Sequence, residues 1–244
     1  MAQSVQLSVV VPVKDEAGNV APLAREIAAA LHSEQSYEIV FVDDGSTDAT
    51  AAELIALRPD LPIRILAHAG NLGQSRALRT GVSAARSGVI VTLDGDGQND
   101  PADIPKLLAL FRREAANPSL AMVAGERLKR RDSLSKRVAS RVGNGIRQTL
   151  LGDKANDTGC GLKVFRRDAF LALPYFDHMH RYLIALMLRE GLEVRFMQVN
   201  HRPRGVGRSK YGVLDRALVG ISDLFGVLWL KRRFRKAGGA PKEL

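Results

Sequence analysis

Residues 7–44, LSVVVPVKDEAGNVAPLAREIAAALHSEQSYEIVFVDD, contain the pattern that decides the fold. Residues 7–13 form a continuous apolar run rich in β-branched side chains, which is typical of a strand buried on both faces. Residues 20–32 repeat their apolar side chains at helical spacing, and residues 37–44 return to the strand pattern. The stretch therefore predicts a strand, a helix and a second strand in succession.

The same alternation continues along the first half of the chain. Further strands are predicted at 63–67, 88–94 and 120–125, and further helices at 47–57, 75–85 and 103–114. This order predicts an α/β fold with an open, mostly parallel sheet and helices on both faces. In such sheets ligands bind outside the carboxyl ends of the strands.

Length and cysteine content restrict the class of protein. The 244 residues suit one domain of moderate size with a small appendage. A single cysteine, Cys160, excludes an internal disulfide framework and fits a reducing compartment. Residues 1–13 lack the basic region and cleavage site of a secretory signal, so we expect a cytoplasmic protein.

The net charge of +10 is unevenly distributed. Residues 127–147 hold eight lysines or arginines against one aspartate, and residues 202–236 hold ten against two. The second half is therefore a candidate surface for nucleic acid, a phosphorylated substrate or acidic lipid headgroups. A solvated basic face is the alternative.

An acidic cluster, VTLDGDGQNDP at 91–101, follows the fourth predicted strand. A calcium loop is excluded, because its glycine and glutamate positions, counted from Asp94, hold Asn99 and Pro105. A turn with solvated acids and a site for Mg²⁺ or Mn²⁺ remain open. The place at a strand end favours the cation, and Asp100 before Pro101 is expected to cap the next helix.

Several other kinds of site are absent from the sequence. The segment after the first strand is no G-x-G-x-x-G fingerprint, and the chain has no P-loop. It also has no zinc-type His/Cys cluster and no nucleophile elbow. The pattern of acids at one end and bases at the other suits a metal-bridged phosphate compound.

Five motifs carry a family resemblance: residues 10–16, 41–50, 71–81, 92–105 and 157–170. Together they closely resemble family 2 glycosyltransferases, and most of all the dolichol- or polyprenyl-phosphate sugar transferases. The resemblance implies a GT-A nucleotide-sugar-binding domain at 1–212, with a donor half at 1–125 and an acceptor half at 126–212. Residues 213–244 would form an amphipathic, basic C-terminal helix and tail.

The resemblance also assigns the donor site. Pro12, Val13 and Glu16 would line the nucleoside, and Asp43 and Asp44 would hydrogen-bond its base and ribose.

A divalent cation, Mg²⁺ or Mn²⁺, would be held by Asp94 and Asp96, with Gln98 as a further ligand. Asp96 is thereby placed among the catalytic residues. Arg202 and Lys210, in a Gly- and Arg-rich loop, would fold over the diphosphate, with Arg202 also acting in catalysis.

The acceptor side follows from the chemistry of a phosphate nucleophile. A phosphate monoester is largely ionised at neutral pH, since its second pKa is about 6, and it therefore needs a cationic pocket rather than a general base. Arg127, which is also assigned a catalytic role, would bind this phosphate with Lys136, Arg137 and Ser140. His180 lies near where hydroxyl-using relatives place their base. It could bind the acceptor phosphate, but we expect it to cap a helix.

The predicted function is therefore that of an inverting hexosyltransferase moving a sugar from a UDP- or GDP-linked donor to polyprenyl phosphate. Transfer to a hydroxyl of a glycan or lipid is the alternative. A nucleic-acid-binding protein is disfavoured, because aromatic platforms beside the basic residues are missing.

The last predicted helix, 214–236, has an apolar part of about 14 residues, short of the roughly 20 that span a bilayer. It could lie among lipid headgroups or pack on the domain. The expected location is peripheral, at the cytosolic membrane face.

Overall fold

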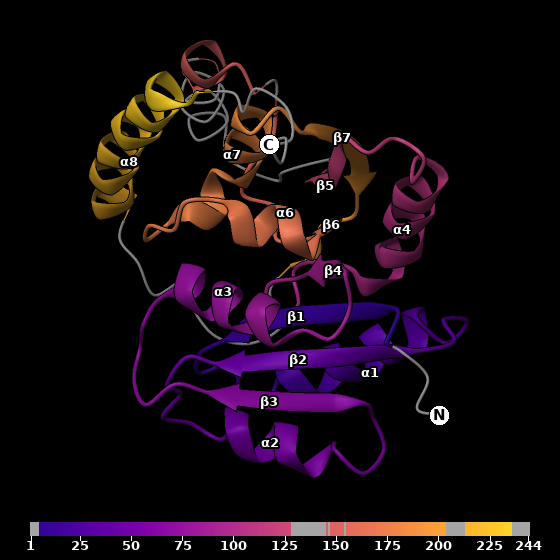
Figure 1. Cartoon of the computed structure of the whole chain (residues 1–244). Coiled ribbons are helices and arrows are strands. Elements are labelled where there is room, and N and C mark those ends of the chain that lie inside the picture. The colour runs from indigo at the N-terminus through magenta and orange to yellow at the C-terminus, as the bar shows by residue number, and fades with distance from the viewer. Residues whose placement is uncertain (1–4, 128–144, 146, 154, 204–212, 236–244) are drawn as a thin grey trace, which may run out of the picture.

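A computed structural model describes residues 5–127, 145, 147–153, 155–203 and 213–235. Its centre is a seven-stranded sheet with the order β3-β2-β1-β4-β6-β5-β7 (Figure 1). The strands are β1 (Leu7–Val13), β2 (Tyr37–Asp43), β3 (Ile63–Ala67), β4 (Val89–Thr92), β5 (Leu120–Arg127), β6 (Lys163–Arg166) and β7 (Glu193–Val199).

The sheet is mostly parallel, as the sequence predicts. β3, β2, β1 and β4 pair in parallel, and β5 pairs in parallel with β7. β6 lies between β4 and β5 and is antiparallel to both. This one reversed strand joins the four parallel strands β3, β2, β1 and β4 to the parallel pair β5 and β7.

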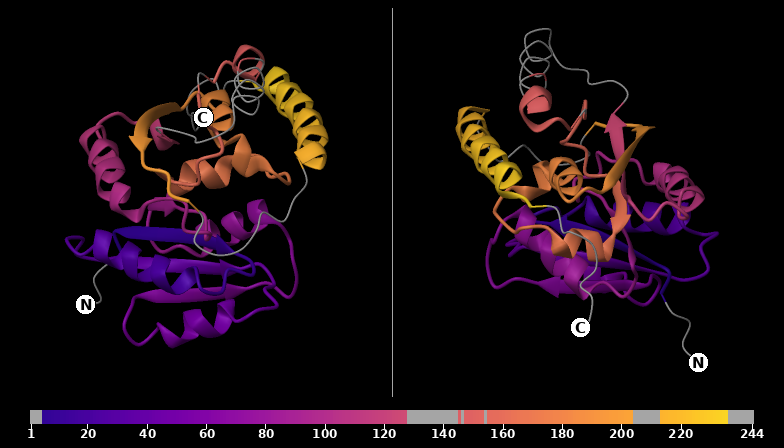
Figure 2. Two further views of the ribbon diagram at one scale, coloured as in Figure 1. Left: turned by 180° about the vertical axis from the view of Figure 1, so that it is seen from behind. Right: turned by 45° about the horizontal axis from the view of Figure 1, so that its top comes forward.

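Helices cover both faces of the sheet, as predicted. Alternate residues of β1 face opposite ways: Val9 and Val11 pack into one core, and Val10 packs into the other. The first core lies under α1 (Val20–Ala30), α2 (Thr50–Ala56), the 3-10 turn η1 (Pro101–Asp103) and α4 (Ile104–Arg113). The second lies under α3 (Gln74–Ala84), α6 (Arg167–Ala172), the 3-10 turn η2 (Met179–Arg181), α7 (Leu183–Arg189) and α8 (Val213–Arg233). In Figure 2, α8 and α4 accordingly lie on opposite sides of the sheet.

The fourth strand ends earlier than the sequence predicts. β4 stops at Thr92, whereas the prediction extended it to residue 94. The physical reason is that the backbone N–H of Asp94 donates to the side-chain oxygen Oδ1 of Asn99 (3.0 Å) and not to a neighbouring strand. Asp94 therefore starts a turn beyond the sheet edge.

Two segments of the second half are also helical. Residues 180–191 contain most of η2 and then α7, and Gly191, with a φ of +77°, follows the last turn. Where they are described, residues 145 and 147–151 are helical. Within the described ranges, no helix has the length and apolar character needed to cross a bilayer.

Candidate active site

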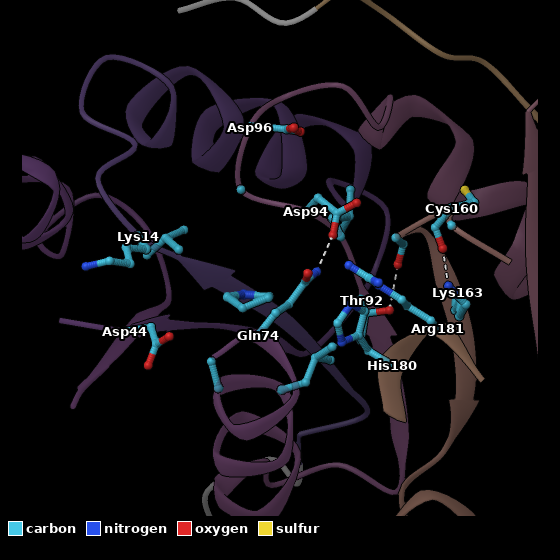
Figure 3. Close-up of a pocket in the computed structure, with 18 of the residues that line it drawn as sticks. Lys14, Asp44, Gln74, Thr92, Asp94, Asp96, Cys160, Lys163, His180 and Arg181 are labelled. Carbon is cyan, nitrogen blue, oxygen red and sulfur yellow. Dashed lines mark hydrogen bonds between the residues drawn. The ribbon is translucent and has the colours of Figure 1, made fainter. Parts of the chain in front are cut away.

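A pocket of about 380 Å³ opens beyond the carboxyl ends of β1 and β4 (Figure 3). Its walls come from the loops after β1, β2 and β4, from α3, from the segment 158–163, and from η2. Six of the predicted site residues line it: Pro12, Val13, Glu16, Asp44, Asp94 and Asp96. Sheet topology therefore brings the predicted donor and metal residues into one cavity.

The loop after β1 is held in place by the loop after β2. The backbone N–H of Glu16 donates to Oγ1 of Thr50 (2.8 Å), and that of Asp15, at a φ of +47°, donates to Oγ of Ser46 (2.9 Å). Lys14 crosses between the loops and donates to the carbonyl of Gly45 (2.7 Å). These bonds fix the edge of the pocket where Glu16 lies.

The two aspartates at the end of β2 have different surroundings. Asp43 accepts from the backbone N–H of Ser46 (2.9 Å) and does not line the pocket. Asp44 accepts from the backbone N–H groups of Leu72 and Gly73, both at 2.8 Å. It also pairs with Nδ1 of His68 (2.8 Å). Asp44 therefore lines the pocket and also shapes the loop that leads into α3.

Asp94 and Asp96, the acidic pair, lie on the loop after β4. Oδ1 of Asp94 accepts from the side-chain amide of Gln74 (2.8 Å), and Oδ1 of Asp96 accepts from the backbone N–H of Gln98 (3.1 Å). A Cβ atom at Gly161 would come within 2.4 Å of Asp94, so only glycine allows this approach. The side chain of Gln98 is not among the groups that line the pocket.

The electrostatics of the acidic pair favour a cation. The pKa of Asp94 is raised to about 6, mainly because burial removes its hydration and secondly because of the negative charge of Asp96. The positive charges of Lys163 and Arg127 lower this pKa in part. No cluster of three or more His, Cys, Asp or Glu side chains forms among the residues described. Two carboxylates with other positions left to phosphate and water are a donor set that suits Mg²⁺ or Mn²⁺.

Lys163 on β6 and Arg181 on η2, the cationic wall, also line the pocket (Figure 3). Lys163 is 4% exposed, and its Nζ donates to the carbonyl of Cys160. Beside it, Oγ1 of Thr92 donates to the carbonyl of Gly161 (2.8 Å). In Figure 3, Arg181 extends into the pocket toward Asp94 and Gln74.

His180 joins η2 to α3, and the prediction that it caps a helix is wrong. Its Nδ1 lies 2.8 Å from Oγ of Ser75 on α3, and its backbone N–H also reaches that oxygen (3.3 Å). Burial, followed by the positive charges of Arg181, Lys163 and His178, lowers the pKa of His180 to about 3. The imidazole is therefore neutral and a weak base at pH 7.

Of the predicted basic residues, the two that the structure describes, Arg127 and Arg202, do not line the pocket. Arg127 forms a two-point ion pair with Asp157 (2.5 and 2.7 Å), in which both side chains are 12% exposed. Arg202 donates to Glu26 (2.6 Å) and to the carbonyl of Asn99 (3.3 Å). Lys136, Arg137, Ser140 and Lys210 lie outside the described residues.

Sequence reasoning gave no role to five polar side chains of the pocket: Asn71, Gln74, Thr92, Lys163 and Arg181. Lys163 had a usable signal, because a lysine inside the apolar run GLKVF is unusual for a solvated residue. Gln74 and Arg181 had no such signal, since only the tertiary fold brings residues 74, 94 and 181 together.

The family model for glycosyl transferase family 2 matches residues 8–173, more than half of the chain. The chain belongs to glycosyl transferase family 2. This confirms the resemblance, and with it the enzyme class.

Two relatives of this family 2 glycosyltransferase illustrate its nearer kin. One is a dodecaprenyl-phosphate galacturonate synthase from Rhizobium johnstonii, 37% identical over 97% of this chain and 70% of its own length. The other is an undecaprenyl-phosphate 4-deoxy-4-formamido-L-arabinose transferase from Edwardsiella ictaluri, 34% identical over 85% of this chain. The chain spans 63% of the length of that second relative.

A solved structure confirms the GT-A fold. Glucosyl-3-phosphoglycerate synthase from Mycobacterium tuberculosis, in complex with Mn²⁺, UDP and glucosyl-3-phosphoglycerate, matches 96% of this chain and 82% of its own. The TM-score is 0.70 at 17% sequence identity, which supports a shared fold and no more.

Proposed function

We propose that this family 2 glycosyltransferase moves a sugar, with inversion, from a UDP- or GDP-linked donor to polyprenyl phosphate. The observation that carries the proposal is that one pocket holds both the acidic pair, on the loop after β4, and the cationic wall, on β6 and η2. The acidic side suits a cation-bound diphosphate, and the cationic side suits a second anion. The relatives' names agree on a polyprenyl-phosphate acceptor, and they differ in the sugar.

The pocket argues against the alternative, a hydroxyl acceptor. Such an acceptor needs a general base whose pKa lies near the working pH. Among the described lining residues, the wall formed by residues 158–163 and 180–183 holds no carboxylate, and His180, with its pKa lowered to about 3, is too weak a base. A phosphate acceptor, already ionised, needs no such group.

Asp94 and Asp96, with Gln98 as a further ligand, would hold Mg²⁺ or Mn²⁺. Bound there, the cation would act as a Lewis acid on the leaving nucleoside diphosphate. Gln74 orients the Asp94 carboxylate through its amide donor. Pro12, Val13 and Glu16 would line the nucleoside.

Asp43 and Asp44 are proposed to hydrogen-bond the base and ribose, and of the two Asp44 lines the pocket. Arg127, Lys136, Arg137 and Ser140 are proposed to bind the acceptor phosphate. Arg202 and Lys210 are proposed to close on the diphosphate, for which Arg202 must leave Glu26.

A surface on α8 suits the membrane that holds such an acceptor. Ile221, Phe225 and Trp229, the α8 stripe, are 54%, 65% and 58% exposed and recur every fourth residue on one face of the helix. The opposite face packs into the second core through Val227, and Arg232 and Arg233 follow the stripe. Exposed apolar residues beside arginines suit the headgroup region of an anionic bilayer. We therefore place the enzyme at the cytosolic membrane face.

Replacing the α8 stripe by serine, as Ile221→Ser, Phe225→Ser and Trp229→Ser together, is expected to lower binding to anionic vesicles at least tenfold. The reason is the loss of apolar area that would enter the bilayer. Co-sedimentation with vesicles of phosphatidylglycerol and phosphatidylcholine measures it. The matched control, Ile55→Ser and Leu72→Ser, removes two exposed apolar residues elsewhere and should bind as the wild type does. Equal loss in both variants would refute the assignment.

The proposed reaction is tested by incubating the protein with UDP- and GDP-sugars, Mn²⁺ and polyprenyl phosphate. A chloroform-soluble, metal-dependent sugar product supports it. Transfer only to free hydroxyl acceptors would establish the alternative.

A further inference from the structure

Arg181 is distinguished from the other arginines near the site by its lack of a partner. Arg127 is paired with Asp157, and Arg202 is paired with Glu26. Within the part of the chain that the structure describes, the Arg181 side chain makes no hydrogen bond or ion pair. A guanidinium group carries five N–H donors and no acceptor, so an unpaired one in a pocket calls for an anion.

The charges around Arg181 are of both signs. Asp223 on α8 interacts with the charge of Arg181, but its ion pair is with His178. Lys163 adds a second cation, with one of its three N–H donors used by the carbonyl of Cys160. His180 is neutral and is held by Ser75. In the pocket, the Asp94 carboxylate is bonded to Gln74. The cationic wall therefore has donors that no described residue uses.

Of the two anions in the proposed reaction, the acceptor phosphate fits this wall better than the donor diphosphate. The diphosphate belongs with the acidic pair and its cation, on the loop after β4. A nucleophile that displaces it with inversion must approach the anomeric carbon from the other side. Arg181 and Lys163 line the pocket from η2 and β6, whereas the acidic pair lies on the loop after β4.

η2, which carries Arg181, is also tied to the proposed membrane helix. Oη of Tyr182 donates to the carbonyl of Gly220 on α8 (2.9 Å). Nδ1 of His178 lies 3.3 Å from a carboxylate oxygen of Asp223, also on α8. These two contacts join the segment that carries Arg181 to the helix proposed to meet the membrane.

We propose that Arg181, supported by Lys163, binds the phosphate monoester of the acceptor lipid inside the pocket. This inference rests on the proposed function. It adds Arg181 to the residues proposed to bind the acceptor, among which Arg127 already forms an ion pair with Asp157. Since the Arg181 side chain has no partner among the described residues, its replacement should leave the melting temperature unchanged.

The test is the binding of farnesyl phosphate, a short soluble prenyl phosphate, measured by calorimetry. Arg181→Gln is expected to weaken the affinity for farnesyl phosphate about 10- to 100-fold, because charge-assisted hydrogen bonds to phosphate are lost. The affinity of Arg181→Lys should lie between those of the wild type and Arg181→Gln, since lysine binds phosphate only as a point charge. UDP affinity should stay within twofold. Arg76→Gln is the matched control, because Arg76 lies on α3 over the Tyr175 ring and outside the pocket.

The outcomes separate this inference from the function on which it rests. Arginine-dependent binding of farnesyl phosphate without sugar transfer would support the inference and refute the proposed function. Unchanged farnesyl phosphate affinity in Arg181→Gln, or a loss confined to UDP, would overturn the inference. Equally tight binding of inorganic phosphate, with the same dependence on Arg181, would also overturn it, because the site would then be one for free phosphate.

Discussion

Asp94→Asn is expected to lower turnover about 10³-fold, because the cation that Asp94 helps to hold contributes several kcal/mol of charge stabilisation in the transition state.

The same variant should melt at a higher temperature than the metal-free wild type above pH 6. The raised pKa of Asp94 means that the folded protein disfavours the carboxylate, so its ionisation removes stability as pH rises from about 4 through about 6. Initial rates and thermal unfolding at pH 5 and pH 8 measure both effects.

Asp100→Asn is the matched control for Asp94→Asn, since it changes a carboxylate on the same loop. Asp100 caps η1 by accepting from the backbone N–H of Ala102 (3.1 Å), as the sequence predicts, and asparagine caps equally well. Its turnover should stay within twofold of the wild type. An Asp94→Asn enzyme with more than a tenth of wild-type turnover, or one that still binds Mn²⁺ normally, would remove Asp94 from the metal site.

Arg202→Ala is expected to lower turnover about 100-fold, the usual consequence of deleting one charge-stabilising donor in an active site. Stability should change by about 1 kcal/mol or less, because the Arg202–Glu26 pair is 34% and 44% exposed. Single-turnover rates with saturating donor, alongside denaturant unfolding, measure the two quantities.

Glu26→Gln provides the opposite test of the same contact. It removes the carboxylate that holds Arg202 away from the pocket and leaves Arg202 in place. Turnover should equal or exceed that of the wild type. If Arg202→Ala keeps wild-type turnover, or if both variants lose activity equally, the pair is structural and Arg202 has no part in the reaction.

The fold was predictable because its signals are local. The β-branched runs of β1 and β2 and the helical spacing in α1 each lie within one short segment, and they gave the strands and the two faces correctly. The antiparallel direction of β6 was not predictable, since strand direction follows from pairing with β4 and β5, about 40 to 75 residues away. Periodicity contains no information about direction.

The candidate site divides in the same way. Asp94 and Asp96 lie on one loop, so the sequence placed them together. The contacts of Gln74 with Asp94, Arg127 with Asp157 and Arg202 with Glu26 join residues 20, 30 and 176 positions apart. Those pairings decide which charged side chains remain available in the pocket, and no sequence motif predicts them.

In the proposed reaction the sugar alone moves, from a nucleotide to a lipid phosphate. The most direct measurement uses a nucleotide sugar labelled with ¹⁴C in the sugar and ³²P in the β-phosphate, together with polyprenyl phosphate. We predict that ¹⁴C enters the lipid and that all ³²P stays with the nucleoside diphosphate. Both labels in the lipid would show transfer of a sugar phosphate. ¹⁴C found only in a hydroxyl-linked glycan would show a different acceptor. Either result would rule out transfer of the sugar alone to polyprenyl phosphate.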